Sequence, residues 1–238
     1  MKLYITKTPR LIQQIFKNYT WRFFTDKKEI YLTFDDGPTS EITEFVLSEL
    51  KKHNAKATFF CIGKNIKNNP KIFEKIISDN HSIGNHTQNH LNGWKKTTEE
   101  YLENVLACEN NLQGFQNLVG LNYKNEKVKA NENTTYKVLK TLQENLKLFR
   151  PPYGKIKKSQ AKELRSLGFK IIMWDVLSAD FDTSITNQKC LENVLKNTTN
   201  GSIIVFHDSK KATEKLKFVL PKVLEYYSKK GFVFKAIA

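Results

Sequence analysis

Short apolar runs alternate with longer segments of helical periodicity along most of this chain, and this alternation limits the folds that it can adopt. Runs rich in Ile, Val, Phe and Tyr at residues 29–34, 57–62 and 202–206 are typical of buried strands. Residues 41–52 and 213–228 place apolar side chains on one face of a helix. Since parallel strands need crossover connections, this order predicts an α/β fold of about six strand–helix units. The other predicted elements are helices at 71–79, 97–111, 159–167 and 188–196, and strands at 147–149, 169–177 and 232–236.

The length of 238 residues and the hydrophobic content of 39% suit a single domain with a sizeable core. Residues 1–28 precede the first strong strand, and we expect them to form an N-terminal extension packed on a domain of residues 29–238. The polar stretch 114–135 shows neither helical nor strand periodicity, so an insertion or a long surface loop is expected there. The three cysteines have long spacings and are expected to be buried free thiols: Cys61, Cys108 and Cys190.

The chain is strongly basic, with 39 Lys and Arg against 24 Asp and Glu and a formal net charge of +15. Such a charge suits nucleic acid, an anionic cell envelope or a well-solvated surface. No signature of a common nucleic-acid-binding module accompanies it, so no specific nucleic-acid partner is expected. Residues 1–22 lack the apolar stretch of a secretory signal, and no segment reaches the roughly 20 apolar residues of a membrane span. A cytoplasmic location is therefore the default expectation, with cell-envelope association as the alternative, and the sequence leaves the oligomeric state open.

Reactive side chains gather at the carboxyl ends of the predicted strands. They are Asp35, Asp36, Arg150, Asp180 and His207. Parallel sheets and barrels place their active sites at this edge, because the loops that follow the strands meet there. Side chains far apart in the sequence are therefore expected to converge on one rim of a barrel.

Two motifs suggest a metal site. Asp35 and Asp36 precede a Gly-Pro turn, and adjacent side chains leave an extended chain in opposite directions, so one carboxylate can face a metal while the other faces water. His86 and His90 have the spacing that puts two imidazoles on one face of a helical turn. With Asp36 they form a set of two imidazoles and one carboxylate, for which Zn²⁺ is the first choice and Co²⁺, Ni²⁺ and Fe²⁺ are alternatives. Each motif also has a plainer interpretation, an Asp-Gly turn or a chance pair of surface histidines.

Five blocks together closely resemble the polysaccharide deacetylases, the NodB homology domain of carbohydrate esterase family 4. They are Thr-Phe-Asp-Asp-Gly-Pro at 33–38, His-Thr-x-x-His at 86–90, Arg-Pro-Pro-Tyr-Gly at 150–154, the block around Asp180, and Phe-His-Asp at 206–208. The resemblance implies a distorted (β/α)₇ barrel that uses one divalent metal ion to hydrolyse N-acetyl groups of amino sugars. An N-acetylated carbohydrate is thus the expected substrate.

The resemblance also implies roles for the residues of the first three blocks. Asp36, His86 and His90 match the metal ligands, and Asp35 matches the general base that removes a proton from water. Arg150 matches the partner that tunes this base. The metal would lower the pKa of water and polarise the acetamide carbonyl.

The remaining roles follow from the last blocks and from the turn after Arg150. His207 matches the general acid, which gives a proton to the departing amine, and Asp180 matches the group that holds it. The backbone N–H of Tyr153 matches a donor to the oxyanion. Phe181 stands where the family often has Trp, so the apolar wall beside the acetyl methyl is expected to differ in shape.

Two other functions compete with this hypothesis. A carbohydrate-binding barrel without turnover would keep the fold but not the reaction, although every expected acid, base and ligand position is filled here. A basic nucleic-acid-binding protein would use the positive charge, although Lys is spread over most of the predicted helices. Without an export signal, a soluble N-acetylated saccharide or precursor is a further candidate substrate.

Overall fold

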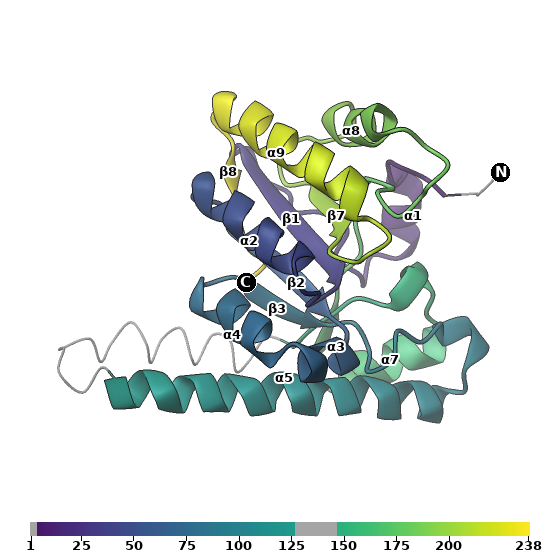
Figure 1. Cartoon of the computed structure of the whole chain (residues 1–238). Helices are drawn as coiled ribbons and strands as arrows, with labels where there is room; N and C mark the ends of the chain where they lie inside the picture. Colours follow the sequence, from purple (N-terminus) through teal and green to yellow (C-terminus); the bar gives the residue numbers. More distant parts are fainter. Residues whose placement is uncertain (1–3, 127–146) are drawn as a thin grey trace.

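A curled parallel sheet lies at the centre of the molecule (Figure 1). The computed structural model describes residues 4–126 and 147–238. The strands follow the order β5-β4-β3-β2-β1-β7-β6, and β8 pairs with the start of β1. Each of these pairs is parallel, as the strand–helix alternation predicts. The strands are β1 (Glu29–Asp36), β2 (Ala57–Cys61), β3 (Ser82–Asn85), β4 (Lys147–Phe149), β5 (Phe169–Ile171), β6 (Val176–Leu177), β7 (Ile203–His207) and β8 (Val233–Phe234).

Helices cover the outer face of this sheet, and α2 lies between α4 and α9 in Figure 1. The α-helices are α1 (Arg10–Ile15), α2 (Ile42–Lys52), α3 (Gly63–Asn68), α4 (Pro70–Ser78), α5 (Thr98–Glu126), α7 (Lys158–Ser166), α8 (Asn187–Leu195) and α9 (Thr213–Lys229). Two short 3₁₀ helices, η1 (Gly93–Lys95) and η2 (Pro152–Gly154), lie in the loops after β3 and β4. No helix in these described ranges is long and apolar enough to cross a bilayer.

The sheet is two-sided, because successive side chains along a strand point to opposite faces. On β1, Ile30, Leu32 and Phe34 are fully buried in the core beneath the helices. Phe34 stacks between Phe59 of β2 and Phe206 of β7, with ring centroids 5.1 and 5.9 Å away. Burying a side chain of this size contributes about 1.5–3 kcal/mol. This outer core holds β1, β2 and β7 in register, so it also positions the polar residues at their carboxyl ends.

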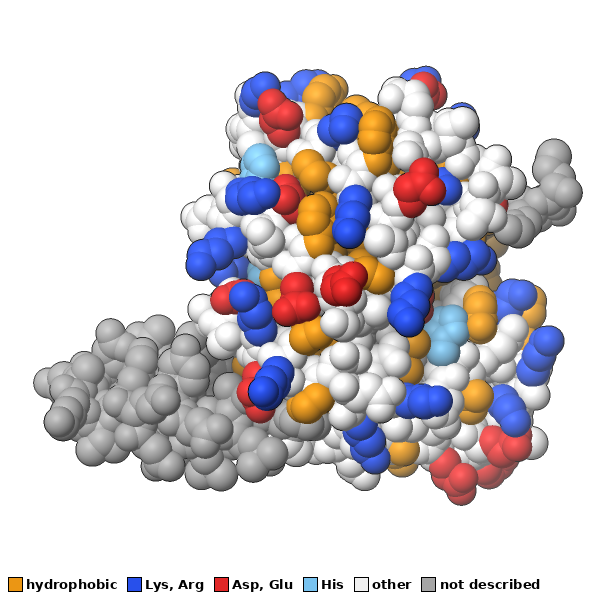
Figure 2. All heavy atoms as spheres, viewed as in Figure 1, with side chains coloured by type: hydrophobic (Ala, Val, Ile, Leu, Met, Phe, Trp, Pro, Cys, Tyr) orange, Lys and Arg blue, Asp and Glu red, His pale blue; other side chains and the backbone are white. Residues whose placement is uncertain are grey.

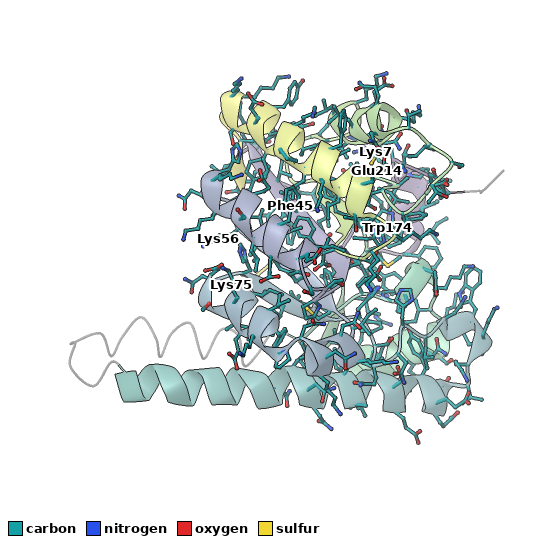
Figure 3. All side chains as sticks on the ribbon, in the orientation of Figure 1. Lys7, Phe45, Lys56, Lys75, Trp174 and Glu214 are labelled. Carbon is teal, nitrogen blue, oxygen red and sulfur yellow. The ribbon has the colours of Figure 1, made fainter. Side chains whose placement is uncertain are left out.

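The sheet curls because the chain runs directly from one of its edges to the other. β5 ends at Ile171 and β6 begins at Val176, yet these strands lie at opposite ends of the strand order. Five residues span at most about 17 Å, so the two edges must approach each other. The single strand predicted at 169–177 is therefore wrong. The apolar run is continuous because the connection is buried as well, and Trp174, labelled in Figure 3, lies within it.

The N-terminal segment lies across the gap between these edges. Thr20 forms a bridge with Ile172 just after β5, whereas Lys7 forms one with Val176 of β6. The ammonium of Lys7, which is labelled in Figure 3, also donates to the buried carboxylate of Asp175 at 2.6 Å. The expected extension thus contacts both edges of the curled sheet, while the division of the chain at residue 28 stays a prediction.

Besides the short helices η1 and η2, the sequence analysis missed three elements: α1, α3 and β3. β3 reads Ser-Ile-Gly-Asn and has no apolar run to reveal it. Its neighbours require it, because β2 pairs with it on one side and β4 on the other. The Phe60 ring packs directly against Gly84, and a Cβ on Gly84 would come within 2.5 Å of that ring.

The loop expected at 114–135 is wrong over its first part, because α5 continues to Glu126. Residues 114–126 contain no Pro, but they include three Asn and two Gly, which have low helix propensity, so the local sequence did not indicate this part of the helix. Residues 127–135 lie outside the described residues. The three cysteines are buried and free, as predicted.

Candidate metal centre and active site

The candidate site begins at the carboxyl end of β1. Asp35 pairs in register with Phe60 of β2 and with His207 of β7, and Asp36 is the last residue of the strand. Adjacent strands lie about 4.8 Å apart, so this register brings Asp35 and His207 together although they are distant in sequence. The left-handed backbone of Asp36, with φ of 84°, turns its side chain toward the loop after β3.

Asp36, His86 and His90 form a compact cluster. Oδ1 of Asp36 lies 3.3 Å from Nε2 of His90 and 3.8 Å from Nε2 of His86. One ligand atom from each residue lies within 4.8 Å of the others. The two imidazoles meet without the expected helical turn, because residues 86–90 form a loop in which Thr87 and His90 have φ of 65° and 55°.

Both imidazoles are neutral in this setting. Burial, followed by the neighbouring His90, lowers the pKa of His86 to about 3. Nδ1 of His86 lies 2.8 Å from the carbonyl oxygen of Arg150, which can only accept, so Nδ1 carries the proton and Nε2 presents a lone pair. Burial also lowers the pKa of His90, whose Nδ1 lies 3.1 Å from the Tyr153 hydroxyl. Neutral imidazoles with outward Nε2 lone pairs are the form that ligates metals.

The donor set fits a divalent cation. Oδ1 of Asp36 is buried and has no hydrogen-bond donor, although two imidazole nitrogens face it. An unpartnered buried acceptor costs about 1–3 kcal/mol. Lone pairs that converge in this way repel one another unless a cation lies between them. Two imidazoles and one carboxylate leave open coordination positions for water and substrate.

Arg150 is a buried cation that holds Asp35 in place. Its guanidinium donates to Oδ1 of Asp35 and to Oγ1 of Thr33, each at 2.7 Å, and to the carbonyl of Met173 at 2.9 Å. The guanidinium carbon lies 4.1 Å from the centroid of the Phe60 ring. Burial lowers the pKa of Arg150 and Asp35 opposes this, so the group stays charged because its ordinary pKa is above 12. The ion pair thus fixes the direction of the Asp35 carboxylate.

His207 at the end of β7 forms an ion pair with Asp180. Its Nδ1 lies 2.7 Å from Oδ1 of Asp180, and its backbone N–H donates to Oδ2 at 2.7 Å. Burial alone would lower the pKa of His207, but the buried Asp180 carboxylate outweighs it and raises this pKa to about 9. The imidazole is therefore protonated at neutral pH. Its Nε2–H is the proton left to donate.

Phe181 lies edge-on to the imidazole of His207, with ring centroids 5.1 Å apart. Tyr4 packs edge-on against Phe181 at 5.6 Å, and its hydroxyl donates to Asp182 at 2.9 Å. Burial, with Asp182 adding to it, raises the pKa of Tyr4 to about 12. The N-terminal segment therefore supports one wall of the site, which no pattern in the sequence indicated.

Asp208 supports the loop that carries Asp36. Its carboxylate accepts from the backbone N–H of Gly37 at 3.0 Å and from the hydroxyl of Thr43. Burial raises the pKa of Asp208 to about 7, although those two donors oppose the rise. Gly37 must lack a side chain, because a Cβ would lie 1.9 Å from Oδ2 of Asp208. Asp208 belongs to the Phe-His-Asp block recognised in the sequence, but its hydrogen bonds to the turn after Asp36 became visible only in the folded structure.

Backbone strain is concentrated in the loops of this site. Non-glycine residues with positive φ in these loops are Asp36, Thr87, His90, Tyr153 and Ala179. Such a conformation costs of order 1–3 kcal/mol per residue and persists only where the surrounding structure imposes it. The strain accords with a site whose side chains are held in place in advance.

A sequence profile described as polysaccharide deacetylase matches residues 23–172, which is more than half of the chain. The chain belongs to the polysaccharide deacetylase family. Its matched region contains the Asp35, Asp36, His86, His90 and Arg150 positions, and the resemblance seen in the sequence is confirmed.

Two relatives and one solved structure illustrate what this polysaccharide deacetylase family member is similar to. One peptidoglycan-N-acetylglucosamine deacetylase of Bacillus cereus is 30% identical over 220 residues, which cover 92% of this chain and 91% of that protein. A second B. cereus protein of the same name is 34% identical over 187 residues, but the chain spans only 57% of its length. The crystal structure of a peptidoglycan N-acetylglucosamine deacetylase has a TM-score of 0.77 at 30% identity, covering 97% of this chain and 95% of that one. The predicted (β/α)₇ type of barrel is thereby confirmed.

Proposed function

We propose that this protein hydrolyses N-acetyl groups of amino-sugar residues in a glycan and depends on one divalent metal ion. The observation that carries the proposal is an aspartate and a protonated imidazole beside one ligand cluster. Asp35 is paired with a buried guanidinium, whereas His207 holds a proton against the Asp180 carboxylate. A carboxylate that accepts a proton and an imidazolium that gives one are what amide hydrolysis requires.

The first half of the reaction is the attack of water on the acetamide carbonyl. A divalent ion held by Asp36, His86 and His90 supplies Lewis acidity to the carbonyl and lowers the pKa of water. Asp35 accepts the proton that the attacking water loses. Arg150 keeps the Asp35 carboxylate oriented while this proton moves, since two of its nitrogens are anchored by backbone carbonyls.

The second half is the departure of the amine. The sugar nitrogen is a poor leaving group unless it gains a proton, and the His207 imidazolium supplies that proton from Nε2. Asp180 stabilises the charged imidazole before the transfer and fixes its orientation through Nδ1. The backbone N–H of Tyr153 is proposed as a donor to the oxyanion, and Phe181 as part of the wall that receives the acetyl methyl. Acetate and a free amino sugar are the products.

The substrate proposal rests on the relatives. Both B. cereus relatives are named as deacetylases of N-acetylglucosamine in peptidoglycan, so an N-acetylglucosamine residue of a cell-wall glycan is our first choice. Zn²⁺ is proposed as the metal. The cytoplasmic location expected from the sequence stays a prediction, and fractionation of cells that make the native protein tests it against the cell envelope.

The decisive experiment measures acetate release from peptidoglycan, N-acetylglucosamine oligomers and acetylated xylan. Chelation is expected to abolish release, and added Zn²⁺ to restore it. Asp35→Asn should lower the rate by about 10²–10⁴ in metal-loaded protein, because it removes the base without removing a ligand. The matched control is Asp26→Asn, which changes an exposed carboxylate outside the site.

Two outcomes would contradict the proposal. Full activity of Asp35→Asn would refute the base assignment. Wild-type protein that binds glycan in the presence of metal yet releases no acetate from any of these substrates would favour a carbohydrate-binding barrel without turnover.

A further inference from the structure

An exposed tryptophan stands beside the candidate metal centre and has no part in the proposed chemistry. Trp94 lies in η1, four residues after His90, and is 60% exposed. Four residues span at most about 14 Å, so the indole is within the reach of a short saccharide bound at the cluster. Aromatic side chains of this size usually bury their surface. An exposed indole at the rim of a glycan site offers a flat apolar face on which a sugar ring can stack.

The indole is held in a fixed position despite its exposure. Its Nε1–H donates to the carbonyl of Ile156 at 3.2 Å, and its backbone N–H donates to Oδ1 of Asn92 at 3.1 Å. The backbone of Gly93 donates to the carbonyl of Lys155 at 3.2 Å and accepts from the buried Gln160 at 2.8 Å. These bonds tie the loop after β3 to the loop after β4. A ring fixed in this way loses little conformational entropy when it binds.

Both loops are anchored in the metal centre at their other ends. The first loop supplies His86 and His90, and the second supplies Tyr153, whose hydroxyl lies 3.1 Å from Nδ1 of His90. Their ring centroids are 4.5 Å apart, and Tyr153 is itself 60% exposed. Tyr153 and Trp94 are therefore two exposed aromatic side chains on adjoining loops of one rim.

A positive charge lies beside the exposed indole. Nζ of Lys155 lies over the Trp94 ring, 5.2 Å from its centroid. Within the described part of the chain, no carboxylate lies within ion-pairing distance of Lys95, Lys155 or Lys158. On the face of the molecule drawn in Figure 2, Lys and Arg side chains are spread widely, with Asp and Glu side chains among them. Glu100 pairs with Lys96 at 3.4 Å and accepts a hydrogen bond from the backbone N–H of Thr97.

We propose that Trp94 and Lys155 form a subsite for a neighbouring sugar of the glycan, and that this subsite prefers glycans that carry carboxylates. The inference rests on the proposed deacetylase function. The flat indole face would stack on the C–H face of a pyranose ring, and the ammonium of Lys155 would lie beside a carboxylate on the same or the next sugar. Peptidoglycan strands offer such carboxylates, whereas oligomers of N-acetylglucosamine are neutral.

The test compares substrates of different length and charge. Trp94→Ala should lower kcat/KM for the N-acetylglucosamine hexamer by about two- to tenfold more than for the monomer, because only the longer substrate reaches the indole. Trp94→Phe keeps an aromatic face and should restore at least half of this length preference. Phe24→Ala is the control, since Phe24 is 92% exposed and lies outside the site loops.

The charge is tested with Lys155→Gln. In this variant, the ratio of kcat/KM for peptidoglycan fragments to kcat/KM for neutral oligomers of equal length should fall by about two- to fivefold. The ratio that remains should depend less on salt concentration. Lys222→Gln is the matched control, because Lys222 also lies over an aromatic ring, that of Phe218, but on α9.

If Trp94→Ala lowers kcat/KM equally for the monomer and the hexamer, the proposed subsite is wrong. If Lys155→Gln leaves the preference for peptidoglycan fragments unchanged, the proposed selectivity for carboxylates is wrong. Failure of the proposed function would look different, since the wild type would release no acetate at all. Calorimetric binding of the hexamer still tests the subsite in that case: weaker binding to Trp94→Ala supports it, and equal binding refutes it.

Discussion

Replacing Asp180 with Asn should move the alkaline limb of the pH–rate profile to lower pH by more than two units. His207 has a pKa of about 9, against an ordinary value of 6.5, and burial alone would place it below that value. The difference of about 2.5 units corresponds to about 3 kcal/mol in favour of the protonated imidazole. The Asp180 carboxylate, 2.7 Å from Nδ1, is the largest source of this free energy, and Asp36 and Asp35 add to it.

The size of the effect follows from the fraction of His207 that carries a proton. At pH 8, a group with a pKa of about 9 is about nine-tenths protonated, whereas one with a pKa of about 6.5 is about 3% protonated. Asp180→Asn should therefore lower acetate release at pH 8 by at least about 30-fold, and by less at pH 6. The folded state holds this proton more tightly than the unfolded state. The ion pair therefore stabilises the fold fully below pH 6.5, and this contribution is lost as the pH rises toward 9.

The assay is acetate release between pH 6 and 10 with saturating metal, together with an NMR titration of the His207 ring. Asp175→Asn is the matched control, because Asp175 is also buried but pairs with Lys7 and Ser202. The control should leave the alkaline limb near pH 9. An Asp180→Asn protein whose limb and His207 titration both stay near pH 9 would refute the reasoning.

Three further outcomes are expected. Arg150→Met should lower the free energy of unfolding by about 3–5 kcal/mol in urea titrations, because it leaves Asp35 buried without its cation; a loss below 1 kcal/mol would contradict this. Gly201→Ala should lower the free energy of unfolding by about 2–5 kcal/mol, because its Cβ would lie 1.8 Å from a backbone oxygen. Gly231→Ala has a similar φ but open space around the new Cβ, so it should lower this free energy by only about 1–2 kcal/mol. Equal losses in the two variants would contradict the argument from the clash. Zn²⁺ at about 100 times its Kd should raise the Tm of the wild type by about 5–10 °C and that of Asp36→Asn by clearly less, and equal shifts would place the metal elsewhere.

The local sequence was sufficient to predict a strand or a helix wherever a single periodicity of apolar residues determined it. The buried runs that became β1, β2 and β7, and the amphipathic stripes of α2 and α9, each follow from a periodicity that the chain carries within a few residues. The five blocks likewise indicated the family, because their residue types and order suffice for that inference.

Local patterns failed where neighbours distant in the sequence decided the structure. β3 has one apolar side chain and exists because β2 and β4 supply its hydrogen-bonding partners. The run at 169–177 became two strands on opposite edges because the sheet curls between them. α5 continues to Glu126 through a stretch with three Asn and two Gly, which local helix propensity does not favour.

The sequence by itself determined which reactive groups the chain carries, the family to which it belongs and the alternation that builds a parallel barrel. Only the tertiary structure decided their protonation and their neighbours. The neutral state of His86, the proton on His207 and the donor-free Oδ1 of Asp36 depend on burial and on partners from other strands. The same is true of Tyr4 beside Phe181 and of Trp94 at the rim. Electrostatic free energies depend on distance and on exclusion of water, and a linear pattern of residues contains neither until the chain folds.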